Sequence, residues 1–174
     1  MDDRTRKSIS KIADWIIEQF DIQIPITDMD AAVAKLGGRI EELEGARVSD
    51  CVRKGAIDEE AFVISISKYD SVARRNFAVA HEIGHLFLHM GYMSNYEIWD
   101  AYDSQTYRIG TTHREFEAHE FASAFLMPQK EFFDCVYANK VDNAVSTDIL
   151  ASYFNVSSGE IVNRGKWLGV LLWR

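Results

Sequence analysis

The sequence predicts an α+β fold, in which a small and mostly antiparallel sheet packs against helices. Three observations support this class: helical periodicity at both ends of the chain, short β-branched segments between them, and a long apolar helix around His81 and His85. With 174 residues, the chain is long enough for one domain with a real core. Its content of 47% hydrophobic and 26% charged residues is that of an ordinary globular protein.

The N-terminal part is predicted to form two helices and then two short strands. Residues 8–20 carry apolar side chains at helical spacing and indicate an amphipathic helix. Residues 27–30 resemble a capping box, and the helix that follows ends at the pair Gly37–Gly38. Residues 39–43 and 50–54 have the pattern of short strands.

A better strand is predicted at residues 62–67, which partly alternate and are rich in β-branched side chains. This segment comes just before the apolar helix. We expect the strand to lie beside this helix with one edge open to the cleft, where it can bind an extended peptide through main-chain hydrogen bonds. A purely structural strand is the alternative, and the sequence leaves both open.

The apolar helix carries the motif His81-Glu82-Ile83-Gly84-His85, an HExxH pattern. Helical residues four apart differ by about 40° in azimuth and about 6 Å in rise, so both imidazoles can bind one ion. Glu82 points elsewhere on the helix, where its carboxylate can act on metal-activated water without being a ligand. The pattern is typical of a zinc hydrolase, with Zn²⁺ as cofactor. The alternative is a pair of hydrogen-bonded core histidines. Gly84 costs a buried helix about 1 kcal/mol relative to alanine, which suggests either the close approach of another backbone or a requirement of the site itself.

Zinc needs a third protein ligand. Position 91, where one class of zinc proteases has a histidine, is glycine here. A second helix is predicted from a capping box at residues 112–115 to Met127. Three candidate ligands share one face of this helix by their spacing: His113, Glu117 and Glu120.

Two sequence blocks surround these candidates. The first combines Arg75-Asn76-Phe77 with HEIGHLFLH at residues 81–89, and the second combines EAHEFA at residues 117–122 with Leu126-Met127-Pro128. Together they resemble the ImmA/IrrE family of metallopeptidases, which pairs an HELGHLLLH-like helix with a later E-A-N-x-F-A-x-x-L-L-M-P block. The resemblance covers roughly residues 20 to 174.

The resemblance implies a zincin-like pair of metal-bearing helices, with Glu82 as the general base. It places the zinc ligands at three positions: His81, His85 and Glu117. It also favours Glu117 over Glu120, because Glu117 occupies the ligand position of the family's block. The chain departs from the family at His119, where asparagine or aspartate is usual, and this histidine can alter the hydrogen bonding near the site or serve as an extra donor.

Two features next to the motif have less specific interpretations. His89 extends the pattern to HExxHxxxH, but it lies another 40° round and about 6 Å beyond His85, a second helical turn away from His81. It is too far along the helix to share the ion of that pair and is expected to be a structural histidine. Residues 92–111 contain several aromatic side chains and are predicted to form a loop near the metal. Such a loop can line a substrate cleft, and a packed surface loop is the alternative. No residue is assigned to stabilise an oxyanion.

The expected organisation is a peptidase domain with N-terminal helices at residues 1–145 and a tail at residues 146–174 packed on the same domain. The spacing of apolar residues around Asn155 resembles a helix-turn-helix. The second tail helix has few basic residues, chiefly Arg164 and Lys166, and the chain has a net charge of −8. DNA contact is therefore disfavoured relative to a structural or partner-binding role.

Composition favours a cytoplasmic protein without membrane association. No apolar run approaches the ~20 residues that cross a membrane, and the first residues lack a signal-peptide core. The two cysteines, Cys51 and Cys135, are isolated, as in proteins of reducing compartments.

Three functional hypotheses follow. The first, implied by the resemblance, is a zinc-dependent endopeptidase that cleaves a regulatory protein, such as a helix-turn-helix repressor of a phage or mobile element. The second is a non-proteolytic regulator with structural zinc, which binds a repressor or DNA through the tail. The third is a DNA-binding module with a vestigial site. The presence of Glu82, which only the chemistry needs, favours the first.

Overall fold

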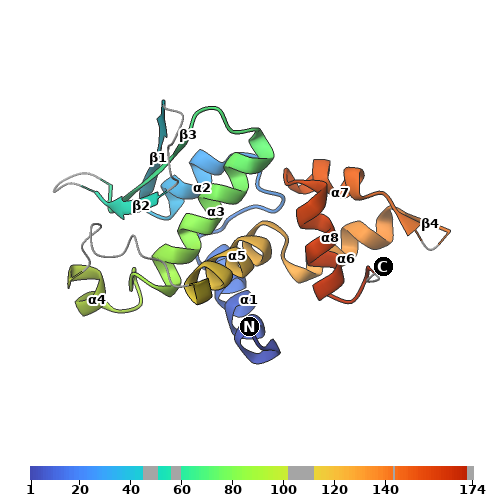
Figure 1. Ribbon diagram of the computed structural model, residues 1–174, viewed down its shortest axis with the longest axis horizontal. Coiled ribbons are helices and arrows are strands. Elements are labelled where there is room, and N and C mark those ends of the chain that lie inside the picture. Colours follow the sequence, from blue (N-terminus) through green and yellow to red (C-terminus); the bar gives the residue numbers. More distant parts are fainter. Residues whose placement is uncertain (45–50, 56–59, 102–111, 143, 172–174) are drawn as a thin grey trace.

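The computed structural model describes residues 1–44, 51–55, 60–101, 112–142 and 144–171. The predicted aromatic loop lies partly outside these residues, at positions 102–111. The elements follow one another along the chain (Figure 1) as α1 (Asp3–Gln19), α2 (Met29–Lys35), β1 (Gly38–Leu43), β2 (Cys51–Lys54), β3 (Phe62–Ser67), α3 (Val72–Leu88), α4 (Tyr96–Ala101), α5 (Thr112–Leu126), α6 (Gln129–Ala138), β4 (Lys140–Val141), β5 (Ala144–Val145), α7 (Thr147–Phe154) and α8 (Ser158–Trp167).

The main sheet has the strand order β1-β3-β2 and is mixed. β1 runs parallel to β3, from the pair Gly38↔Phe62 to the pair Leu43↔Ser67. β2 runs antiparallel to β3. The fold is α+β as predicted, but the expectation of a mostly antiparallel main sheet is corrected. β3 lies at the centre of the sheet, and its first five residues are all buried, as in a strand that is covered on both faces.

The position of β3 also corrects the expectation that one of its edges is open. β1 covers one edge along all of β3, and β2 covers the other edge from Phe62 to Ser65. The main-chain groups on both sides are therefore paired within the sheet over this length. Residues 62–67 therefore form a structural strand, and β3 offers no open edge to an extended peptide from Phe62 to Ser65.

Helices α3 and α5 lie against each other at the centre of the molecule, with the sheet on one side and α6, α7 and α8 on the other (Figure 1). Ser71 caps α3, and its Oγ accepts a hydrogen bond from the Arg74 N–H. Gly84 marks the point of contact: a Cβ there would lie 3.1 Å from both Cα and O of Ala118. The predicted close approach of a second backbone at Gly84 is confirmed.

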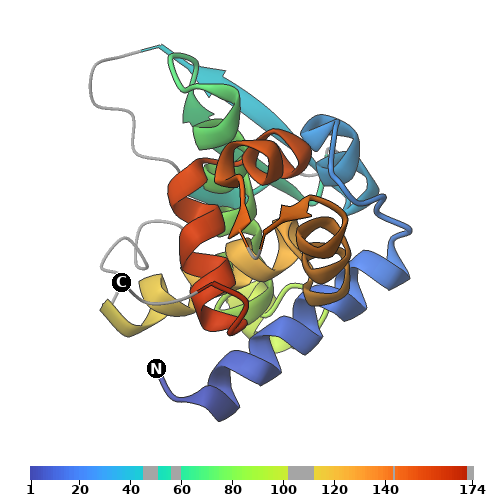
Figure 2. The same cartoon turned by 90° about the vertical axis from the view of Figure 1, so that its right-hand side faces the viewer.

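The two helices of the tail, α7 and α8, face the viewer in Figure 2. They pack on the rest of the chain through polar contacts as well as apolar ones. Asn155 ends α7 in the left-handed conformation, with φ of 53°. Its carbonyl accepts a hydrogen bond from Asn76 Nδ2 in α3, and its own Nδ2 donates to the carbonyl of Ile26. In α8, Arg164 is 3% exposed and its Nε donates to the Met127 carbonyl at 3.0 Å. None of the helices in the described ranges is long and apolar enough to span a membrane.

Candidate metal centre

Helix α3 brings its two motif histidines together on one face. The Nε2 atoms of His81 and His85 lie 3.1 Å apart, and their ring centroids lie 4.8 Å apart. Both side chains are mostly buried, with 20% and 18% exposure. As predicted from the four-residue spacing, the two rings lie next to each other, because about one helical turn separates the two residues.

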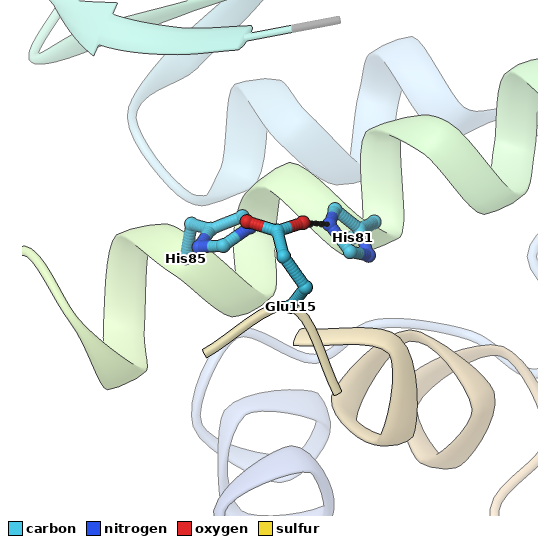
Figure 3. A group of neighbouring side chains, drawn as sticks. All are labelled: His81, His85 and Glu115. Carbon is cyan, nitrogen blue, oxygen red and sulfur yellow. Dashed lines mark hydrogen bonds and ion pairs between the residues drawn. The ribbon is translucent and has the colours of Figure 1, made fainter. Parts of the chain in front are cut away.

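Helix α5 adds a carboxylate to this pair (Figure 3). Oε2 of Glu115 lies 3.2 Å from His81 Nε2, and Oε1 lies 3.4 Å from His85 Nε2. His81, His85 and Glu115 are the one group of possible metal ligands found among the described residues, with ligand atoms all within 4.8 Å of one another.

The spacing of these donors fits a tetrahedral ion. Ligands about 2.0–2.1 Å from a tetrahedral zinc lie about 3.3–3.4 Å from one another. The observed donor distances of 3.1, 3.2 and 3.4 Å are close to that value. Two neutral nitrogens and one carboxylate are also among the donor sets that zinc uses. The residues present therefore fit a zinc ion.

Glu117, the third ligand implied by the sequence resemblance, contacts other histidines. Its Oε2 lies 3.1 Å from His89 Nε2, and its Oε1 lies 3.2 Å from His113 Nδ1. His89 in turn lies beside His85, with their Nδ1 atoms 3.0 Å apart. Glu117 thus belongs to the same string of polar side chains but is one histidine further along it. Glu115 and Glu117 are therefore both candidates for a metal ligand.

The remaining sequence candidates lie in different surroundings. Glu120 is buried and pairs with two arginines, with Oε2 3.0 Å from Arg6 Nε and Oε1 3.5 Å from Arg164 Nη1. His119 packs its ring against Phe77, with centroids 4.8 Å apart. Glu82, the predicted general base, follows His81 in α3 and is 7% exposed.

Glu115 was not among the residues singled out from the sequence as ligands. The three predicted candidates lie on one face of the helix, at steps of four and three residues from position 113, and position 115 lies about 200° from position 113 around the helix axis. The available signal was its place in the first turn of α5. Spacing along α5 alone could not join position 115 to the face that carries His113 and Glu117.

The electrostatics of the site keep its histidines neutral. Burial, helped by the neighbouring His85, lowers the pKa of His81 to about 4. Burial also lowers the pKa of His85, although Glu115 opposes this effect. The pKa of His89 is lowered by burial too, against the opposing effect of Glu117. Neutral imidazole is the form that binds a metal, so protons compete weakly for these nitrogens near neutral pH.

A histidine pair in HExxH spacing, faced by a carboxylate from a second helix, is the arrangement of a metallopeptidase-like domain. The chain belongs to the family Peptidase M78, described as IrrE N-terminal-like domain, whose sequence profile matches residues 46–166. This confirms the resemblance to the ImmA/IrrE family.

Comparison with solved structures supports the same fold. A Mycobacterium tuberculosis transcriptional regulator is similar to the chain, with a TM-score of 0.61 and 20% sequence identity. The similarity covers 93% of this chain and 48% of the regulator, so this chain spans about half the length of that structure. No match was found among the curated proteins.

Proposed function

We propose that this protein is a zinc-dependent endopeptidase that cleaves a regulatory protein. The proposal rests on the group of His81, His85 and Glu115, because the distances between their donor atoms suit a tetrahedral zinc ion. Membership of a peptidase family supports the same activity.

In this proposal His81 and His85 bind Zn²⁺ with one carboxylate from α5. Position favours Glu115, which lies within 3.4 Å of both histidine Nε2 atoms. The sequence resemblance favours Glu117. A bound zinc ion would polarise a peptide carbonyl and make a water molecule a better nucleophile.

Glu82 is the proposed general base. Its carboxylate accepts a proton from the attacking water and passes it to the amine that leaves. The residue lies next to His81 on a rigid helix and is nearly buried, so its position is fixed by the packing of α3. Because His81 and His85 give their lone pairs to the metal ion in this proposal, Glu82 is left as the group that handles this proton.

The proposed substrate is a protein that controls transcription, such as a helix-turn-helix repressor. Two observations support this class: the family relationship to IrrE-like proteins, and the similarity to a structure described as a transcriptional regulator. The second observation concerns a protein of twice the length, so the choice of substrate rests mainly on the family.

The alternative is a regulator that binds a repressor or DNA through the tail. Its DNA form has little support, because Arg164, one of the two basic residues counted on α8, is 3% exposed and paired with Glu120. A guanidinium in that position cannot reach a phosphate backbone. Binding of a repressor by the tail is left as the competing function.

The decisive test compares the wild type with Glu82→Gln, loaded with zinc and incubated with a lysate of the source organism. New protein N-termini are then labelled and identified by mass spectrometry. The variant is expected to retain zinc but lose cleavage by about 10²–10⁴-fold, because the carboxamide cannot accept a proton at neutral pH.

A matched control is Glu131→Gln, a glutamate in the first turn of α6. This variant should cleave like the wild type. If the wild type and Glu82→Gln release the same set of N-termini, the protein is no peptidase, and the binding function takes its place.

A further inference from the structure

Three histidines form a column along α3: His81, His85 and His89. The middle one is engaged at both ring nitrogens. His85 Nε2 faces the donor group, 3.1 Å from His81 Nε2, while its Nδ1 lies 3.0 Å from Nδ1 of His89. His89 Nε2 then lies 3.1 Å from Oε2 of Glu117. The chain of contacts leads away from the candidate metal centre into a carboxylate.

With a metal ion on His85 Nε2, which lies 3.4 Å from Glu115 Oε1, counting protons along this chain leaves one consistent assignment. A neutral imidazole has one N–H and one lone pair. If His85 offers its Nε2 lone pair to a metal, its proton must be on Nδ1, where it can be donated to the Nδ1 lone pair of His89. His89 then carries its own proton on Nε2 and donates it to Glu117. Each contact has one donor and one acceptor.

The surroundings hold His89 in this place. Its side chain is 8% exposed, and its backbone N–H donates to the His85 carbonyl at 2.9 Å, at the end of α3. Glu117 is held from its other side, where Oε1 lies 3.2 Å from His113 Nδ1. The last partner of the chain is therefore fixed by residues of both α3 and α5.

We propose that His89 is a positioning residue, which keeps His85 in the tautomer that presents Nε2 to a divalent metal ion. Glu117 keeps His89 in the matching tautomer. The inference rests on the proposed metal function of His81 and His85. It holds with either Glu115 or Glu117 as the third ligand, since the contact with His89 uses only Oε2 of Glu117.

Two variants of nearly equal length separate this role from simple packing. His89→Gln keeps one acceptor for His85 and one donor for Glu117, whereas His89→Met fills a similar volume with neither. Loss of a hydrogen-bond partner of a metal-binding histidine typically lowers metal affinity by about 10–100-fold. His89→Met is expected to bind Zn²⁺ that much more weakly than the wild type, and His89→Gln is expected to recover most of the affinity.

Zinc affinity is measured by competition with a chromophoric chelator, after circular dichroism has shown that each variant is folded. In parallel, long-range ¹H–¹⁵N spectra of the metal-free proteins report which ring nitrogen of His85 carries the proton. The wild type and His89→Gln are expected to show the proton on Nδ1, and His89→Met a mixture of tautomers.

The proposal is overturned if folded His89→Met keeps the wild-type zinc affinity and the Nδ1-protonated His85. It is also overturned if metal-free wild type has His85 protonated on Nε2, a result that needs no variant to fold. Failure of the proposed function would look different: the wild type would bind no zinc, whatever the tautomer of His85.

Discussion

Glu115 and Glu117 lie two residues apart in α5 but contact different histidines of α3. A zinc site with an open position for water takes only one of them as its third protein ligand, and substitution of each glutamate in turn tells which one binds. Glutamine at either position removes the charge but keeps an acceptor of hydrogen bonds. This makes the two variants controls for each other.

We expect one of Glu115→Gln and Glu117→Gln to lose zinc, while the other retains about one ion per chain. Native mass spectrometry of the zinc-loaded variants measures this content directly. Loss in Glu115→Gln would support the geometry, and loss in Glu117→Gln the sequence resemblance. Full retention in both variants would contradict a carboxylate ligand from α5.

The sequence located the histidine pair because the signal is local: two residues one turn apart on one helix must be neighbours. The carboxylate is harder to locate, because its position depends on how α5 crosses α3. That crossing is set by tertiary contacts such as the one between Gly84 and Ala118. The string from His85 through His89 to Glu117 also depends on side-chain directions, which spacing along the chain does not determine.

At the scale of elements, the contact of Gly84 with α5 sets how closely the two site helices approach. A Cβ at position 84 would lie 3.1 Å from backbone atoms of Ala118 and 3.2 Å from Cβ of Phe121. Backbone atoms at that distance can move only with their helix. Gly159 in α8 offers the comparison, because a Cβ there would meet only Ser157 Oγ at 3.6 Å.

Gly84→Ala is expected to destabilise the protein and weaken zinc binding. Alanine gains about 1 kcal/mol of helix propensity, but overpacking of a core contact costs about 1–3 kcal/mol. The control Gly159→Ala should be neutral or stabilising by up to about 1 kcal/mol. Urea unfolding of both variants gives the free energies. If Gly84→Ala is as stable as Gly159→Ala, the close approach of α3 and α5 has no energetic importance.

Strongly patterned elements were also the ones predicted best. The strand at residues 62–67 has the observed bounds, and the helix predicted from residue 112 begins there. The order of strands was not predictable, since a six-residue apolar strand fits either an edge or the centre of a small sheet. Helices α4 and α6 were not predicted.

At the scale of the molecule, apolar side chains of the tail (residues 146–174) form part of the hydrophobic core. Leu150, Phe154 and Ile161 are almost completely buried. Arg164 and Glu120 form a buried ion pair. Arg6 of α1 also pairs with Glu120, and its guanidinium lies 3.2 Å from the centre of the Trp167 ring in α8. Removing one partner of such a pair leaves an uncompensated charge, which is strongly destabilising.

Deletion of residues 146–174 is therefore expected to unfold the protein. Each large apolar side chain that loses its burial costs about 1.5–3 kcal/mol, against a total stability of about 5–15 kcal/mol. Thermal melts followed by circular dichroism measure the effect. The control Ile149→Ala, at a half-exposed position of α7, should melt like the wild type. A truncated protein with an unchanged melting temperature would show that the tail is a separate unit.

The donors of the candidate centre come from two helices, and His81 and Glu115 are 34 residues apart in the chain. An unfolded chain has no such site, so ion binding and folding share one equilibrium. Free zinc at 100 times its dissociation constant would add about 2.7 kcal/mol to the stability of the folded state. Most of that gain disappears when the ion becomes scarce. The supply of free zinc would then govern how much of this protein survives proteolysis, and so would limit its activity before any substrate is bound.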